Sequence, residues 1–199
     1  MAASLSPQGR VIMISGASRG IGGAIARRLH DDGFSLSLGM RNPVMPDGFD
    51  PARTMVETFD ATVPDDAKRW LDATLSRFGR LDGLINNAGI LRALDLREGD
   101  EAVLDEMWAV NVKAPYRLIR LALPALERAG NGRIINVAST DAKRYRDGVS
   151  VAYTMTKHAV LALSHAAKFA GWEKGVRVTA LCPGAVDTEL VASIPGITP

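Results

Sequence analysis

The sequence predicts an α/β fold in which a doubly wound parallel sheet carries helices on both faces. Short apolar runs alternate with longer segments of helical periodicity, and the runs are nearly continuous, which is typical of strands buried on both faces. Right-handed crossovers between parallel strands then give the doubly wound arrangement. Because ligands bind such sheets at the carboxyl ends of the strands, the residues just beyond each strand are the candidates for function.

The expected strands and helices alternate along almost the whole chain. The strands are expected over residues 10–15, 34–38, 54–59, 81–85, 133–137 and 176–181. A first helix is expected from the spacing of Ile21, Ile25 and Leu29, which recur every four residues. Further helices are expected over residues 67–78, 100–129 and 151–172, and the Pro- and Gly-containing stretch 42–52 is expected to be a surface loop.

Composition and length favour a single domain over residues 1–199. The net charge of +2 at pH 7 comes from both signs spread along the chain, which argues against a nucleic-acid surface or a polybasic membrane anchor. The one cysteine, Cys182, excludes an internal disulfide and fits a reducing compartment. No apolar run approaches the roughly 20 residues that cross a bilayer. We expect a cytoplasmic protein with neither nucleic acid nor membrane as partner, and without zinc or P-loop motifs we expect no metal site.

A glycine-rich turn joins the first strand to the first helix. Gly16 permits the tight turn, Gly20 lets the backbone approach a pyrophosphate, and Gly22 lets the helix pack close to the strand. The helix N-terminus adds unpaired N–H groups and a positive potential. The spacing G-x-x-x-G-x-G differs from the standard G-x-G-x-x-G, so a plain glycine-rich turn is the alternative. In this position it indicates a Rossmann-type dinucleotide site with contacts from Gly16, Ser18, Arg19, Gly20, Ile21 and Gly22.

Motifs also lie directly after the fourth, fifth and sixth expected strands, and another opens the helix after the fifth. They are Asn86-Asn87-Ala88-Gly89, Ser139, Pro183-Gly184 with Thr188, and Tyr153 with Lys157. In this order, and together with the glycine turn, the chain resembles the short-chain dehydrogenase/reductase family over about residues 10–190. The resemblance implies an NAD(P)-dependent oxidoreductase that interconverts a carbonyl and an alcohol by hydride transfer.

The chemistry of Tyr153 and Lys157 can be argued from the residues themselves. Four residues apart on a helix, both side chains lie on one face. A Tyr has an ordinary pKa of about 10 and is a poor acid or base near neutrality, but a nearby ammonium favours the phenolate and lowers that pKa. Tyr153 is therefore expected to exchange a proton with the substrate oxygen while hydride moves to or from the nicotinamide. Out of this context, the alternative is an ordinary helical Tyr and Lys.

The resemblance implies roles for further residues. Ser139 would hydrogen-bond the reacting oxygen, Asn111 would help to hold a water that connects Lys157 to solvent, and Lys157 would also bind the nicotinamide ribose. For Ser139 and Asn111, capping or loop hydrogen bonds are the alternative. The expected catalytic residues are Asn111, Ser139, Tyr153 and Lys157, and the further expected cofactor contacts are Asp60 near the adenine, Asn87, Ala88, Gly89, Tyr153, Lys157, Pro183, Gly184 and Thr188.

The end of the second expected strand bears on the choice of cofactor. NAD-preferring Rossmann proteins tend to place an acid there to bind the ribose 2′-hydroxyl, but this chain has Arg41 and no acid. A second arginine, Arg19, lies in the glycine turn, and a guanidinium can bind a 2′-phosphate with paired donors. We therefore expect NADP(H) in preference to NAD(H), with solvated surface arginines as the alternative.

The resemblance also concerns the C-terminal part of the chain. Family members usually continue beyond the Pro183-Gly184 turn with a helical flap, another helix and a final edge strand, whereas this chain is apparently short at the C-terminus, at Pro199. Part of the substrate wall is therefore not expected within these residues. Among enzymes, a 3-oxoacyl carrier reductase and a sugar or polyol dehydrogenase both stay open. A non-catalytic dinucleotide-binding or regulatory protein is the other alternative, although such a protein would have no need of Ser139, Tyr153 and Lys157.

Two expectations concern partners. Residues 116–129 and 149–172 are apolar on more than one helical face, and the family commonly pairs these two helices, so we expect a homodimer or homotetramer. The small-molecule carbonyl or alcohol substrate would be anionic if the basic side chains of two loops border its cleft. These side chains are Arg92, Lys143, Arg144 and Arg146, and a solvated basic loop is the alternative.

Overall fold

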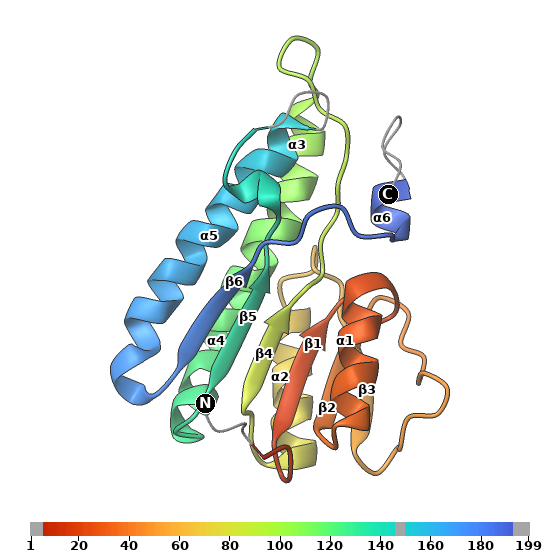
Figure 1. Cartoon of the computed structure of the whole chain (residues 1–199), viewed down its shortest axis with the longest axis vertical. Coiled ribbons are helices and arrows are strands. Elements are labelled where there is room, and N and C mark those ends of the chain that lie inside the picture. The colour runs from red at the N-terminus through yellow and green to blue at the C-terminus, as the bar shows by residue number, and fades with distance from the viewer. Residues whose placement is uncertain (1–5, 146–149, 193–199) are drawn as a thin grey trace.

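The computed structural model of the chain describes residues 6–145 and 150–192, and within them six parallel strands form one sheet in the order β3-β2-β1-β4-β5-β6 (Figure 1). The strands are β1 (Val11–Ser15), β2 (Ser35–Met40), β3 (Thr54–Thr58), β4 (Gly83–Asn86), β5 (Arg133–Val137) and β6 (Arg177–Leu181). The strand order reverses direction between β1 and β4, which pair directly with one another. This order confirms the doubly wound sheet that the sequence predicts and puts the topological switch point next to the glycine turn.

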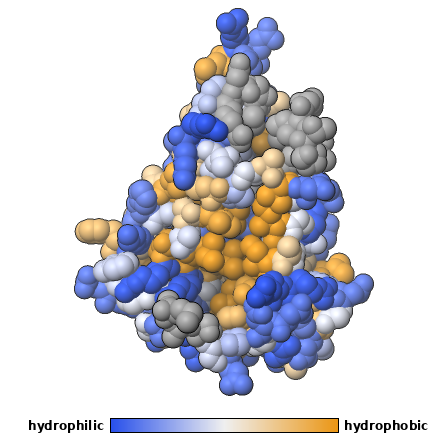
Figure 2. All heavy atoms as spheres, in the orientation of Figure 1, coloured by the Kyte–Doolittle hydropathy of each residue, from blue (hydrophilic) through white to orange (hydrophobic). Residues whose placement is uncertain are grey.

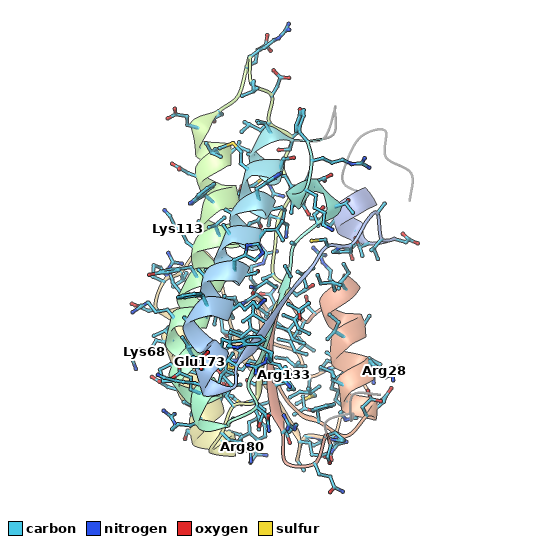
Figure 3. The ribbon with its side chains drawn as sticks, turned by 60° about the vertical axis from the view of Figure 1, so that its left-hand side comes forward. Arg28, Lys68, Arg80, Lys113, Arg133 and Glu173 are labelled. Carbon is cyan, nitrogen blue, oxygen red and sulfur yellow. The ribbon has the colours of Figure 1, made fainter. Side chains whose placement is uncertain are left out.

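Helices cover both faces of the sheet, and Figure 3 shows α1 on one side of it and the pair α4 and α5 on the other. The helices are α1 (Gly20–Asp31), α2 (Asp66–Phe78), α3 (Glu101–Trp108), α4 (Ala114–Arg128), α5 (Val151–Gly171) and α6 (Glu189–Ala192), with short helical turns η2 (Thr140–Ala142) and η3 (Trp172–Lys174). Among the residues that the structure describes, no helix is long and apolar enough to cross a membrane.

The two largest apolar clusters of the core lie one on each face of the sheet. Met13 belongs to the cluster that contains Trp70 of α2, whereas its neighbour Ile14 belongs to the cluster that contains Ala26 of α1. Successive side chains of a strand point to opposite faces, so a run that is apolar at every position fills both clusters. This explains why all five residues of β1 are buried.

The far end of the sheet is less well covered than its centre. β6 contains no buried residue, and on the face of α1 its Leu181 is 44% exposed opposite the buried Val137 of β5. Figure 2 shows apolar side chains gathered in the middle of this face, beside α1. Burial is therefore more complete at β1, where the glycine turn begins, than at β6.

The helical region expected over residues 100–129 is present, but it is not one regular α-helix. Asp100 starts the region, because its side chain accepts a hydrogen bond from the Ala102 N–H at 2.9 Å. Between α3 and α4, the segment η1 (Ala109–Lys113) has π-helical hydrogen bonding. A π-helical turn inserts an extra residue into the helix and occurs frequently at functional sites. Here it contains Asn111, one of the expected site residues.

Candidate active site

The glycine turn has the geometry that a close backbone approach requires. Gly16 has a φ of +67°, and a Cβ on it would lie 2.9 Å from the Ala88 Cα. A Cβ on Gly22 would lie 2.2 Å from the Gly16 carbonyl oxygen, so only glycine lets α1 start this close to β1. Gly20 has a φ of +55°, which also favours glycine. The first N–H groups of a helix have no partner within the helix, and α1 begins at this turn. The local structure therefore offers donors that fit a pyrophosphate.

Hydrogen bonds join the turn to the neighbouring strand β4. They connect Ser15, the last residue of β1, with Asn87, which follows β4. The Asn87 side-chain amide donates to the Ser15 and Gly16 carbonyl oxygens at 3.1 and 3.0 Å. In return, the Ser15 hydroxyl accepts from the Asn87 and Ala88 N–H groups at 3.0 and 3.1 Å. The expected contact Asn87 therefore shapes the glycine turn from β4. Ser15 was not expected in the site, since its part depends on a strand pairing about 70 residues away.

The expected adenine end of the site carries exposed charges. Arg19 and Arg41 are both exposed, and Arg41 is close enough to Asp60 to lower the pKa of that carboxyl. The larger cause of the lowered Asp60 pKa is its hydrogen bonding to Thr62, whose hydroxyl and N–H both donate to one carboxylate oxygen. Asp60 thus closes the turn after β3, where an adenine could lie against it.

The residues after β6 form a strap, residues 183–189, that reaches back to the glycine turn. The Pro183 carbonyl accepts from the Thr140 N–H at 2.9 Å, which holds the base of the strap beside η2. At its far end, a Thr188 methyl carbon lies 3.3 Å from where a Cβ on Gly20 would be. Gly184 has open space around its Cα. The strap therefore brings Pro183 and Gly184 near the catalytic side and Thr188 near the phosphate side.

Ser139 and Tyr153 meet at the carboxyl end of β5. Ser139 starts the turn η2, and its hydroxyl accepts from the Asp141 N–H at 3.1 Å. The Tyr153 side chain shares a hydrogen bond with the Ser139 side chain. Tyr153 is only 7% exposed and packs in an apolar cluster with Leu91 and Met107. The two hydroxyl groups are thus held together, and the capping role that is the alternative for Ser139 is present as well.

Lys157 is buried one helical turn further along α5. It is 5% exposed, its Nζ donates to the Val137 carbonyl oxygen at 2.9 Å, and Nζ lies 5.4 Å from the centre of the Tyr153 ring. Burial lowers the pKa of Lys157 from 10.5 to about 8, although Cys182 nearby works in the opposite direction. The expected arrangement of Tyr and Lys on one helical face is therefore present.

The Tyr153 pKa differs from the sequence expectation. Burial raises it to about 12; the hydrogen bond from Ser139 lowers it, and the Asp141 carboxylate raises it further. The expectation that Lys157 would lower this pKa was wrong for the described geometry, because burial outweighs the other effects and the Lys157 ammonium is engaged by Val137. Asp141, which is 5% exposed, is a neighbour of the site that no sequence motif indicated.

Asn111 joins three elements beneath the site. Its side-chain oxygen accepts from the Ile90 N–H at 2.9 Å, and its amide donates to the Ile90 carbonyl at 2.9 Å and to the Thr156 hydroxyl at 3.1 Å. These hydrogen bonds hold together the loop after β4, the π-helical segment and α5. This is the loop hydrogen bonding that is the alternative role for Asn111. A Cβ on Gly89 would lie 3.3 Å from the Asn111 oxygen and 3.6 Å from the Lys157 Nζ, so Gly89 keeps this space open.

The loops after β4 and β5 lie side by side, because the Val151 N–H donates to the Leu94 carbonyl at 3.2 Å. Of the basic residues expected there, Arg92 contacts Glu106 at 3.4 Å and is half-exposed, whereas Lys143 and Arg144 are exposed. Arg146 lies outside the described residues. Among the described residues of the loop after β5, the charge that acts on Tyr153 is that of the buried acid Asp141.

Comparisons with known proteins identify similar sequences and structures. The chain is 40% identical over 189 residues to an agropine synthesis reductase of Rhizobium rhizogenes, and the match covers 93% of this chain but 44% of that protein, so the chain spans less than half of this relative. Among solved structures, it is similar to the aldohexose dehydrogenase of Thermoplasma acidophilum, with a TM-score of 0.84, 28% identity, and coverage of 92% and 69% of the two chains. It is also similar to the 3-ketoacyl-(acyl-carrier-protein) reductase of Brucella melitensis complexed with NADH, with a TM-score of 0.87, 28% identity, and coverage of 96% and 81%.

The family is established by the sequence order of the motifs, the strand order and the matched residues together. The model of the short chain dehydrogenase family matches residues 10–196, which include the glycine turn, Tyr153 and the strap. The chain therefore belongs to the short chain dehydrogenase family.

Proposed function

We propose that this chain is an NAD(P)-dependent oxidoreductase that interconverts a carbonyl and an alcohol, with Tyr153 as the acid or base. One observation carries the proposal: Ser139, Tyr153 and Lys157 are all buried and converge at the carboxyl edge of the sheet, next to the glycine turn. A chain that only bound a dinucleotide would have no need to bury an amine and a phenol together, since burial of either charged form costs free energy.

In the direction of reduction, Tyr153 acts as the acid. Its pKa of about 12 keeps the hydroxyl protonated near neutral pH, so that it can donate a proton to the substrate oxygen. Ser139, which is hydrogen-bonded to Tyr153, orients the same oxygen. Lys157, whose Nζ donates to the Val137 carbonyl and lies 5.4 Å from the centre of the Tyr153 ring, is proposed to bind the nicotinamide ribose. The cofactor, when bound at the glycine turn, supplies or accepts the hydride.

We propose NADP(H) as the preferred cofactor. No acid stands at the end of β2, and Arg19 and Arg41 present exposed guanidinium groups on the nucleotide side. A guanidinium binds a phosphate through paired, charge-assisted hydrogen bonds. The similar reductase of Brucella melitensis is complexed with NADH, so direct titration of both cofactors is needed to test this preference.

The substrate is proposed to be a small carbonyl or alcohol compound. The similar structures bear the names of an aldohexose dehydrogenase and a 3-ketoacyl reductase, which are the two substrate classes that the sequence left open. An anionic substrate would be met by Lys143 and Arg144, since Arg92 is engaged with Glu106. Replacing Arg144 by Ala and comparing kcat/KM for charged and neutral carbonyls separates a substrate contact from a solvated side chain.

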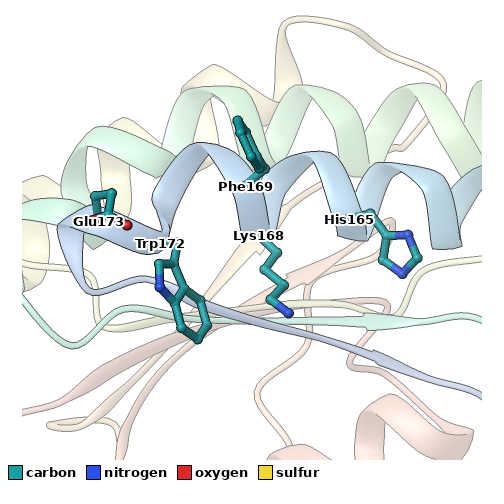
Figure 4. Close-up of a pocket in the computed structure, with 5 residues that line it drawn as sticks. All are labelled: His165, Lys168, Phe169, Trp172 and Glu173. Atoms are coloured by element: carbon teal, nitrogen blue, oxygen red, sulfur yellow. The ribbon is translucent and has the colours of Figure 1, made fainter.

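We propose a homodimer or homotetramer that pairs α4 and α5 with a second copy. Both helices expose large apolar side chains, among them Tyr116 of α4 (53% exposed) and Phe169 of α5 (91% exposed). Figure 4 shows Phe169 standing out from α5, and a hollow of about 430 Å³ is lined by Phe169, His165 and Lys168 of α5 and by Trp172 and Glu173 of η3. Phe169→Lys should shift the molar mass measured by light scattering toward the monomer, because it puts a charge into an apolar contact.

The function is tested by a turnover screen with NADPH and NADH over a panel of carbonyl and alcohol substrates. Turnover of at least one panel member, with binding of the cofactor shown separately by fluorescence titration, supports the enzyme. Tight cofactor binding without any turnover would favour the non-catalytic dinucleotide-binding alternative.

A further inference from the structure

An ion pair joins the strap to the glycine turn, two segments that lie far apart in the sequence. Glu189 pairs with Arg19, which is 170 residues away in sequence. The preceding residue of the strap, Thr188, approaches Gly20, the residue next to Arg19. Two consecutive strap residues therefore meet two consecutive residues of the turn, and the ion pair lies where the strap crosses the nucleotide side of the site.

Arg19 stands at the start of α1, where a negative charge is favourable. It is the N-cap residue, it has no side-chain hydrogen bond to the helix, and the first turn of α1 contains no acid. The carboxylate of Glu189 is thus brought by the strap to a place that α1 itself leaves without an acidic side chain. Both side chains remain accessible, at 64% exposed for Arg19 and 68% for Glu189, so a ligand could displace either partner.

We propose that Glu189 determines part of the choice between NADP(H) and NAD(H), because it competes with the cofactor 2′-phosphate for the Arg19 guanidinium. This inference rests on the proposed function, in which Arg19 and Arg41 bind that phosphate. A cofactor with a 2′-phosphate has to release Arg19 from Glu189, whereas a cofactor with a free 2′-hydroxyl leaves the ion pair intact. Glu189 therefore lowers the affinity for NADP(H) and leaves the affinity for NAD(H) nearly unchanged.

The expected size of the effect is set by the exposure of the pair. Exposed ion pairs contribute so little that their loss changes an equilibrium by about twofold to fivefold. Salt screens such a pair, with a Debye length that shrinks from about 10 Å at 0.1 M to about 3 Å at 1 M. The preference set by Glu189 should therefore be measurable at low salt and should fade at high salt.

The test compares Glu189→Gln with two control variants. Asp187→Asn removes the same charge from the same strap, and Glu189→Asp keeps the carboxylate. Affinities for NADPH and NADH are measured by fluorescence titration, and those for adenosine 2′,5′-bisphosphate and adenosine 5′-monophosphate by calorimetry, at low and high salt. We expect Glu189→Gln to raise the ratio of NADPH to NADH affinity by about twofold to fivefold at low salt. The adenosine pair should show the same change, and both controls should stay near the unmodified chain.

Two results would overturn the inference. One is an unchanged ratio in Glu189→Gln, which would leave the pair with no part in cofactor choice. The other is a lowered ratio, which would mean that Glu189 holds Arg19 in place for the phosphate.

Arg19→Ala separates this inference from the proposed function. If Arg19→Ala leaves NADPH binding unchanged, the assignment of Arg19 to the phosphate fails, and the competition fails with it. If Arg19→Ala weakens NADPH binding and Glu189→Gln does not raise the ratio, only the competition fails. In the Arg19→Ala background, Glu189→Gln should no longer raise the ratio.

Discussion

The two halves of the carboxyl edge of the sheet differ in the exposure of their titratable side chains. We call them the nucleotide half, which includes the glycine turn, and the chemical half, which includes Tyr153 and Lys157. In the nucleotide half, formed at β1, β2 and β3, Arg19 and Arg41 are exposed to solvent. In the chemical half, formed at β4, β5 and α5, Tyr153, Lys157 and Asp141 are between 5% and 7% exposed. An exposed charge gives a modest attraction that salt weakens. Burial displaces the pKa values of Tyr153 and Lys157, which couples their protonation to the stability of the fold.

The difference teaches which kind of effect a change in each half should have. Changes in the buried half should chiefly alter turnover, pH dependence and stability. Changes in the exposed half should alter cofactor affinity and its salt dependence, with little effect on turnover of the saturated enzyme. Variants in each half test this division, in order of decreasing expected effect.

The largest effect is expected for Tyr153→Phe, which removes the proton donor and keeps the ring in its apolar cluster. Turnover should fall by about 10²–10⁴-fold, the usual loss for a positioned acid, while cofactor affinity stays within a factor of about two. Steady-state kinetics and fluorescence titration give the two quantities. Tyr116→Phe, on the exposed face of α4, is the matched loss of a phenol hydroxyl. Near-normal turnover of Tyr153→Phe would remove Tyr153 from the mechanism.

Lys157→Met should lower turnover and raise stability together. A Lys157 pKa of about 8 instead of 10.5 means that the buried charged amine destabilises the fold by about 3 kcal/mol. Methionine removes this cost but also loses the hydrogen bond to Val137, which is worth about 1 kcal/mol. Urea denaturation at pH 7 should therefore show the variant to be more stable by roughly 2 kcal/mol.

The pH dependence of that difference has a defined sign. Between about pH 8 and 10.5, the unfolded chain binds more protons at Lys157 than the folded chain does, so the contribution of Lys157 to stability rises with pH. The variant lacks this rise, and its advantage should shrink as the pH approaches 10.5. A variant that is less stable at pH 7, or whose advantage is constant with pH, would contradict a buried charge at this position.

Arg41→Ala should weaken NADPH binding by roughly tenfold and change NADH binding little, because it removes a charge-assisted contact to the 2′-phosphate. The difference between the two cofactors should diminish as the salt concentration rises. Arg28→Ala, at an exposed position of α1 where Arg28 pairs with Asp32, is the control. Equal weakening of both cofactors would show that Arg41 does not distinguish them.

Asp141→Asn is expected to have the smallest effect of these variants, and one that is visible only in the pH profile. Asp141 raises the Tyr153 pKa, so its neutralisation should lower that pKa. Reduction needs protonated Tyr153, and the alkaline limb of the kcat profile should therefore move to lower pH. An unchanged limb, or a shift to higher pH, would show that the Asp141 charge does not act on Tyr153. Asp105→Asn, in the separate helix α3, controls for the loss of a carboxylate.

The fold was more predictable than the contacts of the site. The apolar runs are local signals, and they indicated the strands to within two residues at each end. The glycine turn and the spacing of Tyr153 and Lys157 are local as well, and the structure has them in the expected elements. The π-helical segment around Asn111 interrupts a region of continuous helical periodicity, so the pattern alone does not reveal it.

The site contacts that the sequence did not predict depend on the packing of distant segments. Ser15 acts on Asn87 through the pairing of β1 with β4, and Glu189 meets Arg19 only because the strap crosses the sheet edge. The Tyr153 pKa was predicted with the wrong sign because spacing shows that Lys157 is near, but not that burial has the larger effect or that Val137 engages the amine. Burial and long-range contacts are properties of the folded chain, and local sequence patterns do not contain them.

The division between the two halves is tested most directly by combining Tyr153→Phe with Arg41→Ala and measuring both turnover and NADPH affinity in the double variant. If the buried half performs the proton transfer and the exposed half binds the nucleotide, the effects are independent. The double variant should then show the turnover loss of Tyr153→Phe and the affinity loss of Arg41→Ala, adding in free energy to within about 0.5 kcal/mol. A loss of turnover at saturating NADPH in Arg41→Ala alone, or a double variant whose losses depart from additivity by more than about 1 kcal/mol, would contradict this account.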